Sequence, residues 1–157
     1  MTAVVEEIIL RPFVIDDVDR ICAQAAQVAD MAYLKQRPRE LWKQLINGAG
    51  DSFAYAAESE GRLLGFAGAC ELWPGRLQGW AVLSSTVTHY EMLWIHRASL
   101  RVIRDLPKSV RRVEITVDEK FWPGHRWAKL LGFAAEGMMK AYDAHGNSHV
   151  LYSLIRG

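Results

Sequence analysis

The most informative segment of this sequence reads Trp127-Ala128-Lys129-Leu130-Leu131-Gly132-Phe133. Its apolar residues recur at helical spacing and stop at Gly132, and glycine is the residue that most readily takes the left-handed conformation just past a helix. The segment therefore predicts a helix over about 124–131 that ends at Gly132. Two strands, 133–144 and 149–155, are expected to follow as a hairpin around Gly146-Asn147.

Upstream of this helix the pattern changes from strand to helix and back to strand. Residues 77–84 read as a strand, residues 88–104 have helical periodicity, and apolar side chains alternate with polar ones over residues 112–117. Two strands joined by a crossover helix in one sheet are almost always parallel and connected with right-handed topology. We therefore expect residues 77–84 and 112–117 to lie parallel.

The amino-terminal half predicts five more elements: a strand over 4–11, helices over 15–29 and 39–46, and paired strands over 52–59 and 62–72. The two residues Glu60-Gly61 between the paired strands are a hairpin signal. The complete order is β-α-α-β-β-β-α-β-α-β-β. It predicts an α+β fold, a mixed and mostly antiparallel sheet flanked by helices, in a single domain over residues 1–157.

The composition excludes several classes of protein. The chain has 157 residues, and 19 Lys and Arg against 18 Asp and Glu give a net charge of +1, which argues against a protein built to bind a polyanion. No apolar run approaches the roughly 20 residues of a membrane helix. Glu6 and Glu7 stand where a signal peptide would carry basic residues. We therefore expect a cytoplasmic protein with no membrane partner.

The order of elements together with the ending Trp127–Phe133 resembles the Gcn5-related N-acetyltransferases, the GNAT superfamily. The opening Leu10-Arg11-Pro12, followed closely by several aspartates, is similar to the start of many members. The resemblance implies transfer of an acetyl group from acetyl-CoA to an amine. It also implies that the coenzyme's pantetheine arm lies between the fourth and fifth strands and its pyrophosphate at the amino end of the next helix. The ending through Tyr142 and Gly146 looks most like a phage-encoded branch, some of whose members are described as internal virion or assembly proteins.

The resemblance assigns coenzyme binding to the loop before that helix, which consists of Ser84, Ser85, Thr86, Val87, Thr88, His89 and Tyr90. This loop contains no glycine, arginine or lysine, and Glu91 follows it with a carboxylate that would repel a pyrophosphate. Thr88 and Glu91 also match a capping box, in which the two residues satisfy each other's backbone and simply start the helix. We therefore interpret the loop as a degenerate coenzyme A loop.

The acid and base of the family are also missing from their usual positions. The family's tyrosine lies four residues before the glycine of the ending, where this sequence has Ala128, and the strand over 77–84 contains no carboxylate. By proximity, the candidate bases are Glu71 and either Asp118 or Glu119. The candidate acids are Tyr142 and Tyr90, and the alternative for Tyr142 is a tyrosine packed on a strand.

Other clusters point to partners rather than to chemistry. Arg97, Arg101 and Arg104 share one helix face, which is either a solvated face or a patch for an acidic protein surface. Some of the six tryptophans are expected to be exposed and to contact other subunits. Asp105 interrupts the basic patch and no nucleic-acid motif accompanies it, so we do not expect nucleic-acid binding. The five histidines lack metal-ligand spacing, and we expect no metal site.

Two functions remain open at this point. The three missing features favour a GNAT-fold protein of the phage type, weakly active or non-catalytic, that serves as a structural or assembly protein and is virion-associated if phage-encoded. The alternative is an acetyl-CoA-dependent N-acetyltransferase that acts on an amine. Fold alone does not choose between them, because function depends on the site.

Overall fold

The computed structural model of this protein describes residues 7–24, 27 and 50–157. Its sheet has seven strands in the order β1-β2-β3-β4-β5-β7-β6, and every neighbouring pair is antiparallel except β4 and β5. The strands are β1 (Ile8–Pro12), β2 (Phe53–Ser59), β3 (Arg62–Trp73), β4 (Arg76–Leu83), β5 (Arg112–Asp118), β6 (Ala134–Met139) and β7 (His149–Ile155). The expected α+β fold and the parallel crossover are both confirmed.

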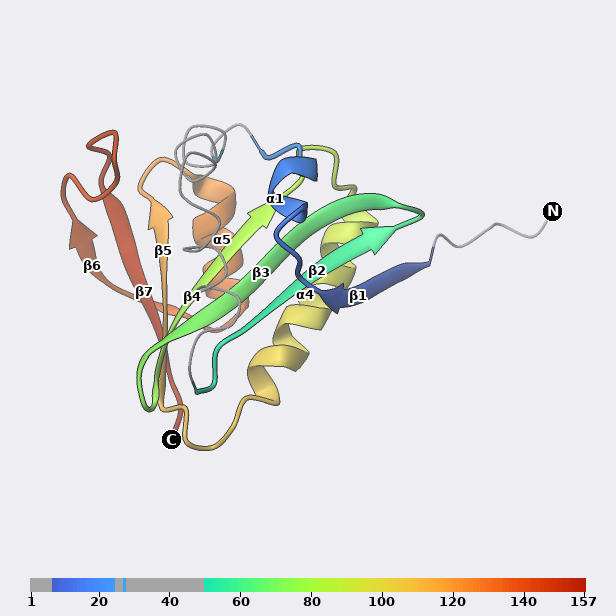
Figure 1. Cartoon of the computed structure of the whole chain (residues 1–157). Coiled ribbons are helices and arrows are strands. Elements are labelled where there is room, and N and C mark those ends of the chain that lie inside the picture. Colours follow the sequence, from blue (N-terminus) through green and yellow to red (C-terminus); the bar gives the residue numbers. More distant parts are fainter. Residues whose placement is uncertain (1–6, 25–26, 28–49) are drawn as a thin grey trace.

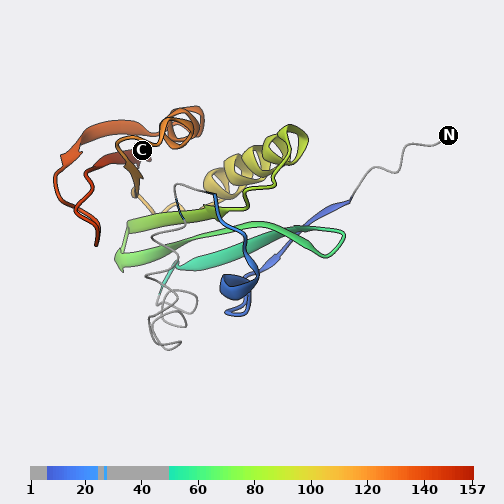
Figure 2. The same ribbon diagram turned by 90° about the horizontal axis from the view of Figure 1, so that it is seen from above.

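The helices cover the two faces of the sheet (Figure 2). The described helices are α1 (Asp17–Arg20), α4 (His89–Arg104) and α5 (Trp122–Leu130). Figure 2 shows α4 and α5 on one face and α1 on the other. None of the helices in the described part of the chain is both long enough and apolar enough to cross a membrane.

Each face of the sheet buries its own apolar cluster. Leu77, Val113 and Phe133 belong to the larger cluster, which also contains Ala128 of α5. On the opposite face, beside α1, Phe13 and Phe66 pack with a ring-centroid distance of 4.7 Å. Successive side chains of a strand point to opposite faces, and apolar residues at both sets of positions allow both faces to be covered.

Two backbone turns form where the sequence predicts them. Glu60 and Gly61 both have positive φ, at 49° and 78°, which matches the mirror-image turn that joins two-residue hairpins. Gly132 has φ of 98° directly after α5, so the helix ends at the expected glycine. The last hairpin is shorter than predicted, because β6 ends at Met139 and not at residue 144.

The long helix predicted over residues 15–29 is interrupted: Asp17–Arg20 and Gln27 are helical, but residues 21–24 are not. Helix α1 is a single turn, and Ile21 already has extended backbone with φ −72° and ψ 131°. Ala23 forms an antiparallel bridge with Ser84, at the end of β4. Pairing with β4 therefore replaces the helical hydrogen bonds that the apolar spacing suggested. Residues 4–6 of the first predicted strand and the helix predicted over 39–46 lie outside the described residues.

Candidate functional site

The central feature of the sheet is the divergence of β4 and β5. The two strands pair in parallel only at Arg76↔Arg112, Leu77↔Val113 and Gln78↔Glu114. Beyond these pairs β4 continues to Leu83 and β5 to Asp118 without pairing with each other. Figure 1 shows the two arrowheads pointing the same way and spreading apart. From residue 79 onward, one edge of β4 therefore has no strand neighbour in the described sheet.

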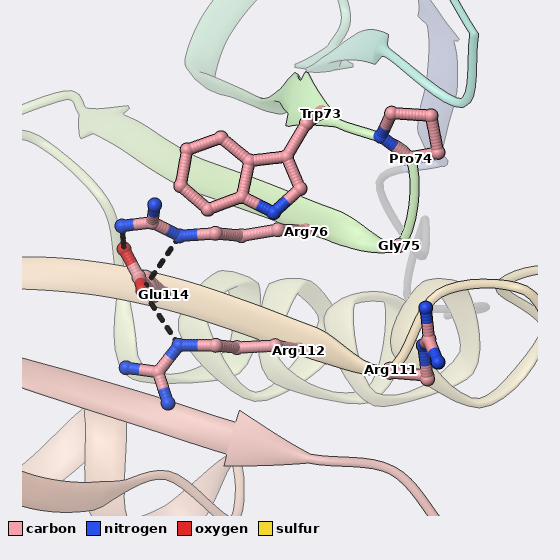
Figure 3. Close-up of a pocket in the computed structure, with 7 residues that line it drawn as sticks. All are labelled: Trp73, Pro74, Gly75, Arg76, Arg111, Arg112 and Glu114. Carbon is pink, nitrogen blue, oxygen red and sulfur yellow. Dashed lines mark hydrogen bonds and ion pairs between the residues drawn. The ribbon is translucent and has the colours of Figure 1, made fainter.

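A network of ion pairs holds the closed end of this divergence (Figure 3). Arg76 donates two hydrogen bonds to Glu114, at 2.8 and 2.7 Å, and Arg112 donates a third at 2.6 Å. Arg112 also binds both oxygens of Glu136, at 2.8 and 2.5 Å. The Arg76 guanidinium lies 4.2 Å from the ring centroid of Trp73, and both residues line a depression of about 420 Å³. These side-chain contacts connect β4, β5 and β6 near the short stretch in which β4 and β5 pair through their backbones.

The arginines lower the pKa values of their carboxylate partners. The hydrogen bonds from Arg76 are the main reason that the pKa of Glu114 is lowered; burial opposes the shift and Arg112 adds to it. The hydrogen bonds from Arg112, followed by the one from Ser153, lower the pKa of Glu136 to about 2. Both groups are therefore charged throughout the neutral range.

The amino end of α4 lies near the end of β4 and forms the predicted capping box. The Thr88 hydroxyl accepts the Glu91 N–H at 3.2 Å, and the Glu91 carboxylate accepts the Thr88 N–H at 2.9 Å. Glu91 is only 2% exposed, and its second oxygen pairs with Arg62. Burial raises the pKa of Glu91, but the hydrogen bonds from Thr88 and Arg62 outweigh it, so the net shift is downward.

The loop before α4 satisfies part of its own polar groups. The hydroxyls of Ser84 and Thr86 lie 2.9 Å apart, and the Thr86 N–H donates to the Ser84 hydroxyl at 3.2 Å. Ser85 donates its N–H to the Cys22 carbonyl at 2.7 Å. Val87 packs on the cluster around Ile95.

The first two residues of α4 are different. His89 and Tyr90 are exposed, and within residues 7–24, 27 and 50–157 their backbone N–H groups have no acceptor. Unpaired N–H groups at the start of a helix point outward along its axis and favour an anion. The tip of α4 therefore keeps two open donors beside its capping box.

The unpaired edge of β4 carries contacts from the chain that follows α1. The Gln27 side-chain amide donates to the Ala81 carbonyl at 2.7 Å and accepts the Leu83 N–H at 3.1 Å. The Gln24 N–H donates to the Leu83 carbonyl at 3.0 Å. These groups occupy the edge that β5 leaves open.

No protein-family model and no curated protein matches the sequence, but solved structures match the fold along nearly the whole chain. An acetyltransferase assigned to the GNAT family from Desulfovibrio desulfuricans has a TM-score of 0.69 at 17% identity, and the match covers 95% of this chain and 99% of that one. The ribosomal-protein-S5-alanine acetyltransferase from Vibrio fischeri has a TM-score of 0.68 at 16% identity, with 96% and 94% covered. A spermidine N-acetyltransferase SpeG chimera from Vibrio cholerae and hSSAT has a TM-score of 0.68 at 13% identity, with 94% and 95% covered.

The chain has the GNAT acetyltransferase fold. The resemblance implied that the fourth and fifth strands diverge, and β4 and β5 do so in the structure. Residues 84–88 connect β4 to α4, the helix that follows this strand.

Two of the three predicted catalytic residues gather at the open end of β5. Asp118 is the last residue of β5 and pairs in register with His149, and its carboxylate accepts the Lys120 N–H at 2.8 Å. The Tyr142 ring is 4.9 Å from the ring of His149, but it lies in the connection between β6 and β7 and is 44% exposed. The alternative that Tyr142 is a tyrosine packed on a strand is therefore wrong.

The other candidates lie elsewhere in the GNAT fold. Glu71 pairs in register with Leu77 at the closed end of the divergence, and its carboxylate accepts the Asp51 N–H at 2.7 Å. Tyr90 is 58% exposed on the first turn of α4. Ala128 is buried in the core, so the position of the family's tyrosine faces packed side chains and offers no proton.

A histidine and a tyrosine hold the end of β5 against α5. His125 Nε2 lies 3.0 Å from the Glu119 carbonyl, which can only accept, so this nitrogen carries the proton. The other nitrogen, Nδ1, then accepts from the Tyr152 hydroxyl at 2.7 Å. Burial raises the pKa of Tyr152. Both side chains are thereby engaged in positioning the backbone that follows Asp118.

Asp118, Asp143 and His149 also lie close enough to hold a metal ion, with ligand atoms within 4.8 Å of one another. The two oxygens of Asp143 already accept hydrogen bonds from the residues of its own turn, His145 and Asn147, and from His149. This geometry is explained by the folding of the turn.

Sequence reasoning missed Arg62 and Gln27. Residues 84–91 contain no arginine or lysine, yet Arg62 from β3 brings a guanidinium to Glu91 and within 3.4 Å of the Thr86 hydroxyl. The hairpin prediction contained the signal, since it starts β3 at Arg62. Gln27 carries no motif, and only the tertiary structure shows that its amide contacts β4.

We expect Glu136→Gln to make the protein less stable at neutral pH. We also expect the stability of this variant to depend less on pH in the acid range than that of the wild type. A carboxylate whose folded pKa is depressed contributes stability above its ordinary pKa, and that stability is lost as the pH falls through the folded value. For Glu136 the loss runs from an ordinary pKa of 4.5 down to about 2. Thermal melts across this range should show the wild type and the variant converging toward the acid end. Glu119→Gln, outside the arginine network, should run parallel to the wild type; equal curves for Glu136→Gln and wild type at neutral pH would contradict the prediction.

Proposed function

We propose that this protein is an acyl-CoA-dependent N-acyltransferase that binds acetyl-CoA where β4 and β5 diverge. The observation that carries the proposal is the end of their pairing at Gln78 and Glu114, because it leaves an edge of β4 that no strand of the described sheet pairs and along which an extended chain fits. In the reaction an amine nitrogen attacks the thioester carbonyl carbon and forms the amide bond. The carbon–sulfur bond breaks, the amine loses a proton to a base, and the thiolate leaves and takes a proton.

The tip of α4 supplies the groups for the coenzyme's diphosphate. The open N–H groups of His89 and Tyr90 and the remaining N–H groups of the Arg62 guanidinium form a set of hydrogen-bond donors, and helix amino ends favour phosphates. Glu91 is already neutralised by Arg62, so its carboxylate repels a phosphate less than the sequence suggested. We assign residues 84–90 to coenzyme binding on this basis, with Arg62 added.

Among the three proposed catalytic residues, Asp118 has the position that fits a base best. It stands at the carboxyl end of β5, where ligands of open sheets with parallel strands tend to bind. Tyr142 is the proposed acid from the same end, and Glu71 is a weaker choice because it lies at the closed end. The two named neighbours that acetylate spermidine and ribosomal protein S5 alanine support an amine as the acceptor class.

Calorimetric titration with acetyl-CoA tests the proposal. We expect measurable binding by the wild type and about tenfold weaker binding by Arg62→Ala, since a charge-assisted hydrogen bond contributes about 1.5–3 kcal/mol. Lys108→Ala removes the same charge beyond the other end of α4 and should bind like the wild type. Absence of binding by the folded wild type would overturn the proposal, and equal binding by all three would remove Arg62 from the site.

One observation favours a second function, a non-catalytic structural or assembly protein of the phage type. The capping box of Thr88 and Glu91 and the paired hydroxyls of Ser84 and Thr86 use groups that a coenzyme loop would offer to phosphate. In this reading the loop is degenerate and the protein is virion-associated.

Its partners would contact two kinds of exposed side chain, tryptophan and arginine. Trp73 and Trp122 are 57% and 76% exposed, and the side chains of Arg97, Arg101 and Arg104 are exposed on α4. This function predicts no acetyl-CoA binding together with ordered self-association or co-purification with particle proteins. A monomer that binds acetyl-CoA contradicts it.

A further inference from the structure

The open edge of β4 is already bound by one side chain that imitates a strand. In a parallel pair of strands, one residue donates its N–H to the carbonyl of residue i−1 on the neighbouring strand and accepts the N–H of residue i+1. Gln27 makes this pair of contacts with a single side-chain amide, to the Ala81 carbonyl at 2.7 Å and from the Leu83 N–H at 3.1 Å. Val82 is the residue between them.

The direction of these groups places Gln27 on the side of β4 that β5 leaves. Ser84 donates its N–H to the Leu64 carbonyl of β3 at 2.8 Å. Successive residues of a strand turn their backbone groups to opposite edges, so Ala81 and Leu83 face away from β3. Since β5 pairs with β4 no further than Gln78, this is the edge of the divergence.

Backbone groups at such an edge need partners. A buried and unpaired N–H or carbonyl costs about 1–3 kcal/mol, which Gln27 avoids by satisfying one of each. A ligand that lies along β4 as an extended chain with amide groups would require the same carbonyl and the same N–H. The pantetheine arm of an acyl-CoA is a chain of this class, with two secondary amides.

We infer that Gln27 is an internal competitor for the coenzyme, which must displace its amide from Ala81 and Leu83 before the arm can lie along β4. The inference rests on the proposed function and concerns the regulation of the same site. The amide holds the edge closed in the free protein, and the affinity for acetyl-CoA is lowered by the free energy needed to release it. Whatever removes the Gln27 amide from β4 thereby increases coenzyme binding.

The test compares acetyl-CoA titrations of the wild type, Gln27→Ala, Gln27→Met and Gln24→Ala. Methionine retains the length of the side chain and lacks both the donor and the acceptor. Gln24 contacts β4 through its backbone N–H, so Gln24→Ala leaves that hydrogen bond in place and is the matched control. The loss of two neutral hydrogen bonds from the free protein, each contributing about 1 kcal/mol net, predicts about tenfold or greater tightening in both Gln27 variants. The control should bind like the wild type.

Amide hydrogen exchange of Leu83 supplies a readout that does not depend on the coenzyme. Its N–H should exchange faster in both Gln27 variants than in the wild type and in Gln24→Ala, while the melting temperatures show that all four proteins are folded. Tighter binding with faster Leu83 exchange supports the inference. Equal or weaker binding by the Gln27 variants, with the wild type binding, overturns the inference and leaves the proposed function standing. If no folded variant binds acetyl-CoA, the proposed function and the competition both fail.

Discussion

Leu77→Ala is expected to lower the free energy of unfolding by about 3 kcal/mol. The side chain is completely buried, and the residue pairs in register with Val113 at the short parallel joint between β4 and β5. Alanine would leave a cavity in the larger apolar cluster, to which Leu77 belongs, and packed cores close such cavities only in part. Chemical denaturation measures the loss, and in a chain of this size it corresponds to a fall in melting temperature of roughly 6–12 °C.

Leu72→Ala is the matched control for this experiment. Leu72 lies on β3, but it is 43% exposed, so its truncation should change the free energy of unfolding by no more than about 0.5 kcal/mol. A similar loss in both variants would mean that the joint between β4 and β5 is no more tightly packed than the exposed surface of the sheet.

Glu91→Ala is expected to cost about 2 kcal/mol of folding free energy at neutral pH. The substitution removes the acceptor of the Thr88 N–H, so the capping box is lost, and it leaves Arg62 without its buried partner. Arg62 is 39% exposed and can be hydrated, which keeps the cost below that of a fully buried pair. Urea denaturation of the wild type and the variant measures the difference.

Glu91→Gln separates the cap from the charge. Glutamine can accept the Thr88 N–H in the same way, so we expect this variant to lose only about half as much, roughly 1 kcal/mol. Because the pKa of Glu91 is lowered in the folded protein, the stability from its charge is present above the ordinary carboxyl value of 4.5 and declines as the pH falls below it. The wild type and Glu91→Gln should therefore converge in acid. A Glu91→Ala variant as stable as the wild type would contradict the role of the capping box.

Features that depend on a few neighbouring residues could be predicted from the sequence. The Glu60-Gly61 turn, the end of α5 at Gly132 and the Thr88–Glu91 capping box all appear where their residue types require them. The parallel crossover also followed, because the handedness rule limits how a strand, a helix and a strand can connect. These signals are enough for the fold class and for the order of the strands that the structure describes.

The helix expected over 15–29 shows that local apolar spacing does not always predict the structure. Its apolar spacing suits a helix, yet the backbone of Cys22 and Gln24 bonds to Ser85 and Leu83 at the end of β4. The backbone groups of Cys22 and Gln24 bind the edge of β4 in preference to forming a further helical turn. No local sequence pattern indicates that this edge lacks a neighbouring strand.

The residues that make up the candidate site could likewise not be predicted from local sequence patterns. Residues 84–91 contain no arginine or lysine, but β3 brings Arg62 to the tip of α4, and the chain after α1 brings the Gln27 amide to β4. Turns, caps and strand order are local preferences, so the amino-acid sequence specifies them directly. The parting of β4 from β5, and the side chains that meet there, depend on contacts between residues more than twenty positions apart, which form only when the whole sheet assembles.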